Sequence, residues 1–274
     1  MTRRGVEMSD ERDAGVVGGG EPGAGLDEPA TTRRRRSYTA AMESRRVLVI
    51  GDGDIGAIVA SAAAADGALM AEPDAAKRRA IRPVLWTPVF RGETARARRW
   101  ASRRQAELFE MELVEPAADE AASAPEGEWP RDTGELVQAS ITAVKLGCST
   151  VVWPTHSVHA ESPDLDDVSR AVDRALLVAR LISLDADHHG CPSFRIETPL
   201  VDLSDRMLAD LVLDMDLPVR LCWWWHAEMS SGGSGEFLRQ HDRWTGVLEA
   251  VGWRTEARGE RLEPGPRHAA PDAR

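Results

Sequence analysis

A glycine-rich loop that carries two aspartates is the segment of this sequence whose residue types could most directly do chemistry. Residues 51–56 read Gly-Asp-Gly-Asp-Ile-Gly, which matches the pattern G-x-G-x-x-G. Glycines at this spacing let the backbone approach a phosphate, and free N–H groups at a helix start attract anions. The charges of Asp52 and Asp54 would repel a pyrophosphate unless a cation intervened. The loop therefore predicts a dinucleotide site, a phosphate site that needs a cation, or a tight turn without a ligand.

A dinucleotide site requires a second feature in the sequence. A dinucleotide-binding protein carries an acidic residue near the end of its second strand, where it binds the ribose. The second apolar run of this chain ends at residues 86–89, Trp-Thr-Pro-Val, without an acid. A dinucleotide site built on Gly51, Gly53 and Gly56 stays open as one hypothesis, but the motif alone is weak support for it.

A segment much later in the chain has a more specific pattern. Residues 196–204 read I-E-T-P-L-V-D-L-S. Pro199 fixes an extended backbone and Ser204 can cap a helix, so the segment also makes structural sense without any chemistry. It is very similar to the T-P-L-I-D-L-S segment of 7-cyano-7-deazaguanine synthases, which belong to the PP-loop ATP-pyrophosphatase family.

The rest of the resemblance is looser and covers roughly residues 46–252. Residues 146–148, 217–219, 162–164 and 129–132 stand at the places of the family's L-G-A, G-V-P, Y-P-D and V-P-x-R-N segments. The family's first loop, S-G-G-x-D-S, corresponds to residues 50–55. There the chain keeps the first glycine and the aspartate, but isoleucine replaces both serines and Asp52 replaces the second glycine.

The resemblance implies the family reaction, in which ATP and Mg²⁺ drive conversion of 7-carboxy-7-deazaguanine to the nitrile in queuosine biosynthesis. It makes Asp54 the candidate catalytic residue. The candidate nucleotide-binding residues are Gly51, Asp52, Gly53, Gly56 and Arg131, and the candidate substrate-binding residues are Pro163 and Asp164. Because the serines are missing, three hypotheses stay open: a diverged ATP-dependent ligase, a pseudoenzyme that binds or scaffolds, and a dinucleotide-binding protein.

The zinc site of the family is predicted to be absent. Its last three cysteine positions correspond here to Ser234, Phe237 and Gln240, although Gly235 and Arg243 are kept. A substitute metal site is one alternative, with ligands drawn from His188, His189, Cys191, Cys222 and His226. The other interpretation is that the cysteines are small core residues and the histidines lie on a surface loop.

Aromatic and histidine residues supply two further candidates. Three tryptophans in a row, residues 223–225, could stack on a purine-like ring, but we favour a place in the core or at an interface. His156 and His159 follow the fourth expected strand and could each be a general acid or base, or simply be solvated.

Apolar runs and amphipathic stretches alternate along the middle of the chain. Strands are predicted at 47–50, 83–89, 111–114, 150–153 and 194–196, and helices at 55–65, 93–110, 132–147, 166–184, 204–215 and 235–252. The helix at 166–184 is predicted to be amphipathic, because Val168, Val172, Leu176 and Leu181 lie near helical spacing. Asp132 or Thr133 is expected to cap the helix at 132–147, and Gly147 to end it. The alternation predicts an α/β fold, a Rossmann-like doubly wound parallel sheet, which the resemblance specifies as the adenine-nucleotide α-hydrolase type.

Bulk composition limits the remaining options. The 274 residues carry a net charge of −11, which argues against a general nucleic-acid or membrane binder. Three widely spaced cysteines and no long apolar run favour a cytoplasmic protein. We expect one domain over residues 45–254 between disordered tails at 1–44 and 255–274. Its expected partner is a small deazapurine or a nucleotide, and a homodimer is a further option.

Overall fold

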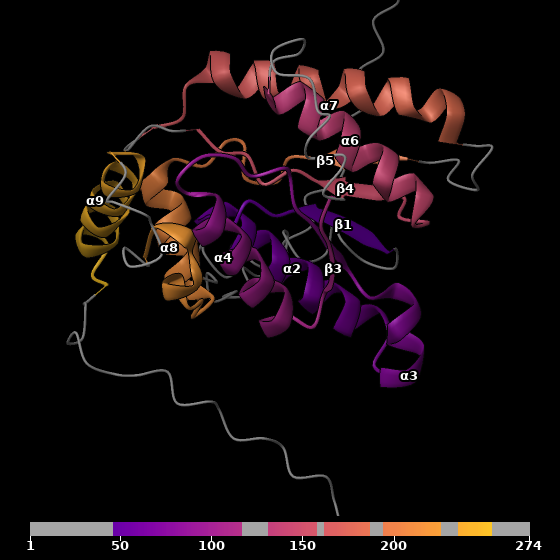
Figure 1. Ribbon diagram of the computed structural model, residues 1–274, viewed down its shortest axis with the longest axis horizontal. Helices are drawn as coiled ribbons and strands as arrows, with labels where there is room; N and C mark the ends of the chain where they lie inside the picture. The colour runs from indigo at the N-terminus through magenta and orange to yellow at the C-terminus, as the bar shows by residue number, and fades with distance from the viewer. Residues whose placement is uncertain (1–45, 117–130, 158–161, 187–193, 226–234, 254–274) are drawn as a thin grey trace, which may run out of the picture.

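A five-stranded parallel sheet forms the centre of the computed structural model, which describes residues 46–116, 131–157, 162–186, 194–225 and 235–253. The strand order is β3-β2-β1-β4-β5, and every neighbouring pair is parallel. The strands are β1 (Val47–Ile50), β2 (Val84–Trp86), β3 (Glu112–Val114), β4 (Thr150–Val152) and β5 (Arg195–Glu197) (Figure 1). The chain winds outward from β1 in both directions, which confirms the predicted doubly wound α/β fold.

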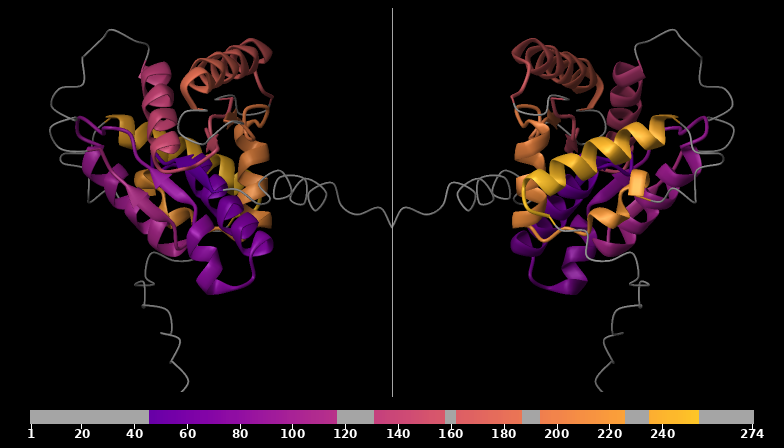
Figure 2. Two further views of the ribbon diagram at one scale, coloured as in Figure 1. Left: turned by 90° about the vertical axis from the view of Figure 1, so that its right-hand side faces the viewer. Right: turned by 90° about the vertical axis from the view of Figure 1, so that its left-hand side faces the viewer.

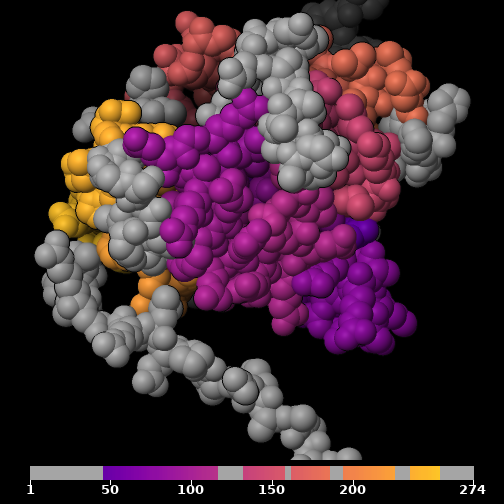
Figure 3. All heavy atoms as spheres, in the orientation of Figure 1, coloured from indigo at the N-terminus to yellow at the C-terminus, as the bar shows by residue number. Residues whose placement is uncertain are grey.

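Helices cover both faces of this sheet. Their bounds are α2 (Ile55–Ala71), α3 (Ala75–Arg78), α4 (Ala95–Leu108), α6 (Arg131–Lys145), α7 (Leu165–Ala186), α8 (Asp205–Asp214) and α9 (Gly235–Ala250), with short 3₁₀ turns η1 (Arg79–Ile81), η3 (Val219–Leu221) and η4 (Trp223–Trp225). Helices α6 and α7 lie on one face, and α2 and α4 lie on the other, with α8 beside α2 and α9 on the outer side of α8 (Figures 1 and 2). In the space-filling view, α4 lies at the surface between α3 and α9 (Figure 3).

The central strand explains why the sheet needs both layers. Leu48 and Ile50 pack with α6 and α7, whereas Val47 and Val49 pack with α2 and the end of α4. All four side chains are buried. A strand that is buried on both faces is an uninterrupted apolar run, and this is the pattern that identified it in the sequence.

Several element boundaries and one helix face differ from expectation. Helix α6 begins at Arg131, so Asp132 lies in its first turn and not at its cap. On α7, Leu176 and Leu181 are 63% and 56% exposed, and the buried face instead carries Ala171, Ala175 and Val178. The helix has apolar residues around most of its circumference, so the contacts with α6 and β5, and not the spacing alone, decide which face is buried.

Two helix ends lie where the residues next to them in the sequence predict a cap. Ser204 caps α8, where its side chain accepts a hydrogen bond from the N–H of Met207. Gly147 follows α6 with a φ of 71°, a conformation in which glycine pays no steric cost. None of the helices in the described ranges is long and apolar enough to cross a membrane.

Candidate functional site

Two adjoining hollows lie where the order of the sheet reverses, outside the carboxyl ends of β1 and β4. In doubly wound sheets this is the usual place of a ligand. The first hollow, of about 230 Å³, is lined by the loop after β1, the start of α2, the first turn of α6 and residues 153–156. The second, of about 220 Å³, lies toward the start of α7. They share Asp132, Trp153, Thr155 and His156, and together we call them the switch-point cleft.

Local structure accounts for two of the three glycines of the first loop. A Cβ on Gly51 would lie 2.5 Å from Leu85 Cδ1, and one on Gly56 would lie 2.6 Å from the carbonyl oxygen of Pro154. Gly53 has a φ of 77°, and a Cβ there would come within 2.8 Å of Ala101 Cβ. Backbone crowding or a positive φ thus requires glycine at Gly53 and Gly56 whether or not a phosphate binds, whereas at Gly51 the neighbour is the side chain of Leu85.

Asp54, the candidate catalytic residue, holds two parts of the fold together. It is the N-cap of α2, where its Oδ1 accepts a hydrogen bond of 2.8 Å from the N–H of Ile55. The same oxygen accepts a hydrogen bond of 2.7 Å from the indole Nε1 of Trp224, which is buried. One carboxylate oxygen is therefore occupied, although Asp54 also lines the first hollow.

Asp52 stands in the place of the family's second glycine. Its Oδ1 accepts a hydrogen bond of 2.9 Å from the N–H of Asp54, and its Oδ2 lies 3.8 Å from Nη1 of Arg98. The side chain of Asp52 is 43% exposed, so it keeps part of its hydration. Partial loss of hydration and the neighbouring Asp54 raise its pKa, while Arg98 opposes both effects. The loop thus places the Asp52 carboxylate next to a second negative charge, that of Asp54.

The electrostatics of the first hollow disfavour a triphosphate. Its lining carries four carboxylates, those of Asp52, Asp54, Asp132 and Glu135, and within the described lining no lysine or arginine. A nucleotide phosphate would meet like charges at short range. The described residues also contain no group of three His, Cys, Asp or Glu side chains that could hold a metal ion. The first hollow therefore offers a nucleotide phosphate no cationic side chain from its described lining, whereas Arg170 and Arg174 line the second hollow.

The remaining predicted site residues lie elsewhere. Arg131 opens α6, but its side chain falls outside the described residues. Asp164 caps the start of α7, because its Oδ1 accepts from the N–H of Asp166 and its own N–H donates to Ser157 Oγ. Neither Pro163 nor Asp164 lines the two hollows. The structure thus places Gly56, Asp52 and Asp54 in the lining of the cleft, and Asp164 next to that lining through Ser157.

A cluster of charged and polar side chains lies beside the cleft, and the sequence did not predict that its members would lie together. Asp205, in the first turn of α8, accepts hydrogen bonds from Nε and Nη2 of Arg243 on α9. Its Oδ1 lies 3.3 Å from Nε2 of His156, and the side chains of Asp205 and His156 are 3% and 13% exposed. Burial raises the pKa of Asp205, but hydrogen bonds from His156 and Arg243 outweigh it, so the pKa is lowered.

The frame of the family zinc site is filled by an aromatic core. Phe237 is buried and meets Trp223 edge-on at 6.3 Å between ring centroids, and Cys222 is a buried free thiol. Burial raises the pKa of the Cys222 thiol well above its ordinary value, with smaller contributions from Asp54 and Asp52. The other suggested metal ligands, His188, His189, Cys191 and His226, together with Ser234 and His159, lie outside the described residues.

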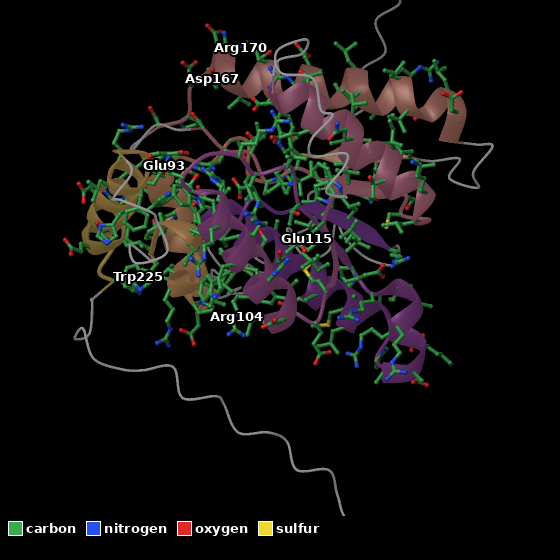
Figure 4. All side chains as sticks on the ribbon, in the orientation of Figure 1. Glu93, Arg104, Glu115, Asp167, Arg170 and Trp225 are labelled. Atoms are coloured by element: carbon green, nitrogen blue, oxygen red, sulfur yellow. The ribbon has the colours of Figure 1, made fainter. Side chains whose placement is uncertain are left out.

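The tryptophan run also packs inside. Trp223 and Trp224 are fully buried, and Trp224 stacks on Trp244 at 6.3 Å between ring centroids. Trp225 is half-buried beside α9, where it meets Trp253 edge-on (Figure 4). The favoured interpretation of this run as core is confirmed for its first two members.

Comparisons with known proteins give a distant likeness to solved structures and nothing nearer. No family model matches the chain, and no curated protein matches it. Among solved structures, it is similar to the U34-tRNA thiolase NcsA from Methanococcus maripaludis with its [4Fe-4S] cluster. The TM-score is 0.45 at 13% sequence identity, over 80% of this chain and 76% of that one. A likeness at this level carries no argument about activity, so the fold stands on the sheet described above.

Proposed function

We propose that this chain is a diverged PP-loop-like protein that binds a small molecule in the switch-point cleft and has lost the ATP-dependent reaction. One observation carries the proposal: the carboxylate that would serve the reaction, Asp54, is engaged in holding the fold. Its Oδ1 is shared between the start of α2 and Trp224. Removal of both serines from the loop fits the same view, because hydroxyl groups that would bind phosphate are replaced by apolar side chains.

The charge of the first hollow supports the loss of nucleotide chemistry, although Arg170 and Arg174 line the second hollow. Four carboxylates line the first hollow, and Arg98, the nearest described arginine to Asp52, donates to Glu236 at 2.8 Å and stacks on Trp223. That guanidinium is therefore directed to the α9 side of the loop. A protein that only binds a ligand or acts as a scaffold does not require these side chains to catalyse a reaction.

A second candidate is a diverged 7-cyano-7-deazaguanine synthase that has kept an altered form of its activity. It is favoured by the start of α2, where Gly56 and Ala57 line the first hollow and their backbone N–H groups have no partner within the helix. Mg²⁺ held near Asp52 and Asp54 would be needed to offset their charge. A dinucleotide site is less well supported, because β2 ends in Trp86 and Thr87 without an acid and local structure already accounts for two of the three glycines.

Pyrophosphate release tests the two candidates against each other. The full chain would be incubated with ATP, Mg²⁺, 7-carboxy-7-deazaguanine and ammonium. We expect no pyrophosphate above a control without protein. Release that depends on all four components, and that falls in the variant Asp54→Asn, would overturn the proposal and favour the synthase.

A further inference from the structure

Helix α7 exposes more large apolar side chains than any other helix in the described residues. It lies along the top of the molecule in Figure 1, with α6 and β5 as its packing neighbours. Each exposed leucine is between 56% and 76% exposed, and the set is Leu165, Leu176, Leu177, Leu181 and Leu184. Four of them fall between positions 176 and 184. Single exposed leucines are common on protein surfaces, but a contiguous apolar patch marks an interaction site.

The same face of α7 carries one negative and one positive side chain. At spacings of four, three and four residues, a single line along the helix runs through Asp173, Leu177, Arg180 and Leu184. Both Asp173 and Arg180 are exposed. They lie two turns apart, about 10 Å along the helix axis, whereas ion pairs within a helix form between residues three or four apart. These two charges therefore do not pair with each other in one copy of the helix.

The helix itself offers neither charge a suitable partner. Leucine and serine fill the positions three and four residues away from Arg180, namely Leu176, Leu177, Ser183 and Leu184. Arg180 thus gains no ion pair from its own helix at the usual spacing. Asp173 has Arg170 three residues before it, but that guanidinium donates a hydrogen bond to Asp167 (Figure 4).

A two-fold axis between Leu176 and Leu177 would pair both charges at once. In an antiparallel pair of α7 helices about this axis, Asp173 of one copy faces Arg180 of the other, and the two central leucines face each other. Two copies meet through the same patch in such a dimer, so each contact occurs twice. A register shifted by one turn would instead set Asp173 against Leu184. Both charges would then lose hydration beside leucine without gaining an opposite charge.

We infer that α7 is a dimerisation surface on which a second copy of this chain packs antiparallel, with Asp173 of each copy paired to Arg180 of the other. The order of charges along the leucine patch favours a second copy over a lipid surface or an unrelated protein, because the patch is complementary to itself. A homodimer was one expectation from the sequence, and α7 supplies its surface and its orientation. Neither Leu177 nor Arg180 lines the switch-point cleft, so the dimer does not depend on the proposed function.

Sedimentation equilibrium of the full chain, from low to high micromolar concentration, tests the inference. We expect a reversible dimer for the wild type. Leu177→Glu places a carboxylate beside the axis, opposite an apolar side chain, and should give a monomer over the same range. Leu238→Glu is the matched control and should remain dimeric, because Leu238 is 52% exposed on α9. A monomeric wild type, or a Leu177→Glu dimer as tight as that of the wild type, would overturn the inference.

Charge reversal tests the orientation of the two helices. Asp173→Arg and Arg180→Asp each set like charges opposite one another twice, so each should raise the Kd of the dimer about tenfold. The double variant restores opposite charges and should return the Kd close to that of the wild type. Far-UV circular dichroism checks that each variant is folded, which we expect because only exposed side chains are changed. Single variants that dimerise like the wild type, or a double variant as weak as either single one, contradict the inference.

Discussion

Asp54 is the residue at which a structural and a catalytic role make opposite predictions. Asp54→Ala removes the cap of α2 and leaves the buried Trp224 indole N–H without its acceptor. We expect a loss of about 1 to 3 kcal/mol in the free energy of unfolding, measured with urea. Asp54→Asn keeps an oxygen for both donors and should lose much less. If Asp54→Ala were as stable as the wild type, the structural role that we assign to this carboxylate would be wrong.

Two further aspartates should give stability changes of opposite sign with pH. The pKa of Asp205 is lowered from 3.8, so its contribution is present above pH 3.8 and is lost as the pH falls through the lower folded value. The stability difference between the wild type and Asp205→Asn should therefore shrink in acid.

The pKa of Asp52 is raised from 3.8, so its protonated form favours the folded state and its ionised form opposes it. Asp52→Asn should be more stable than the wild type at neutral pH, and this gain should fade as the pH falls toward 3.8. Urea titrations at pH 3 to 7 measure both differences. A gain for Asp52→Asn that does not change over this range would contradict the assigned origin of the shift.

Residue-level prediction from the sequence succeeded where the signal was local and failed where the partner was distant. The cap of α8 by Ser204 can be predicted from the residues next to it in the sequence. The hydrogen bond between Asp54 and Trp224 spans 170 positions, and the contact between Asp205 and Arg243 spans 38. Nothing in either residue's neighbours indicates such a partner. The spacing of the glycines was visible, but the backbone and side chains that crowd them were not.

Helix α9 shows how one element is held without the cysteines of the family. Phe237, Trp244 and Leu248 are buried in the core beside α2 and α8. Truncation of a buried aromatic leaves a cavity, so Phe237→Ala should lower the free energy of unfolding by about 3 to 5 kcal/mol. Leu238→Ala is the matched control, because Leu238 is next in the helix and 52% exposed. Equal unfolding free energies of the two variants would show that α9 does not depend on this core.

Helix α7 is the element whose buried face the sequence mispredicted. Leucines at 176 and 181 carry the strongest apolar signal, but alanines at 171 and 175 make the packed face. Small side chains allow α7 to approach its neighbours, and a spacing rule that weights large residues misses this. The expected homodimer stays a prediction.

At the scale of the whole molecule, the topology of the sheet could be predicted from the sequence, but the charge of the cleft could not. Parallel strands buried on both faces and alternating helices leave few topologies, and the carboxyl ends of β1 and β4 then mark the ligand side. The carboxylates of Asp132 and Glu135 reach the same hollow only because α6 begins above the switch point. Charge in the cleft is thus a tertiary property, and the carboxylates of the first hollow are the basis for our proposal that the ATP chemistry suggested by the local motif has been lost.

Isothermal titration calorimetry of the full chain with ATP and Mg²⁺ tests the central claim most directly. We predict no binding heat for the wild type, since the loop lacks both hydroxyl side chains and four carboxylates line the first hollow. Asp52→Asn is the matched control, because it removes one of these charges and keeps the acceptor for the N–H of Asp54. Micromolar binding by the wild type that requires Mg²⁺ and weakens in Asp52→Asn would contradict the account, because Asp52 would then serve a metal–nucleotide site.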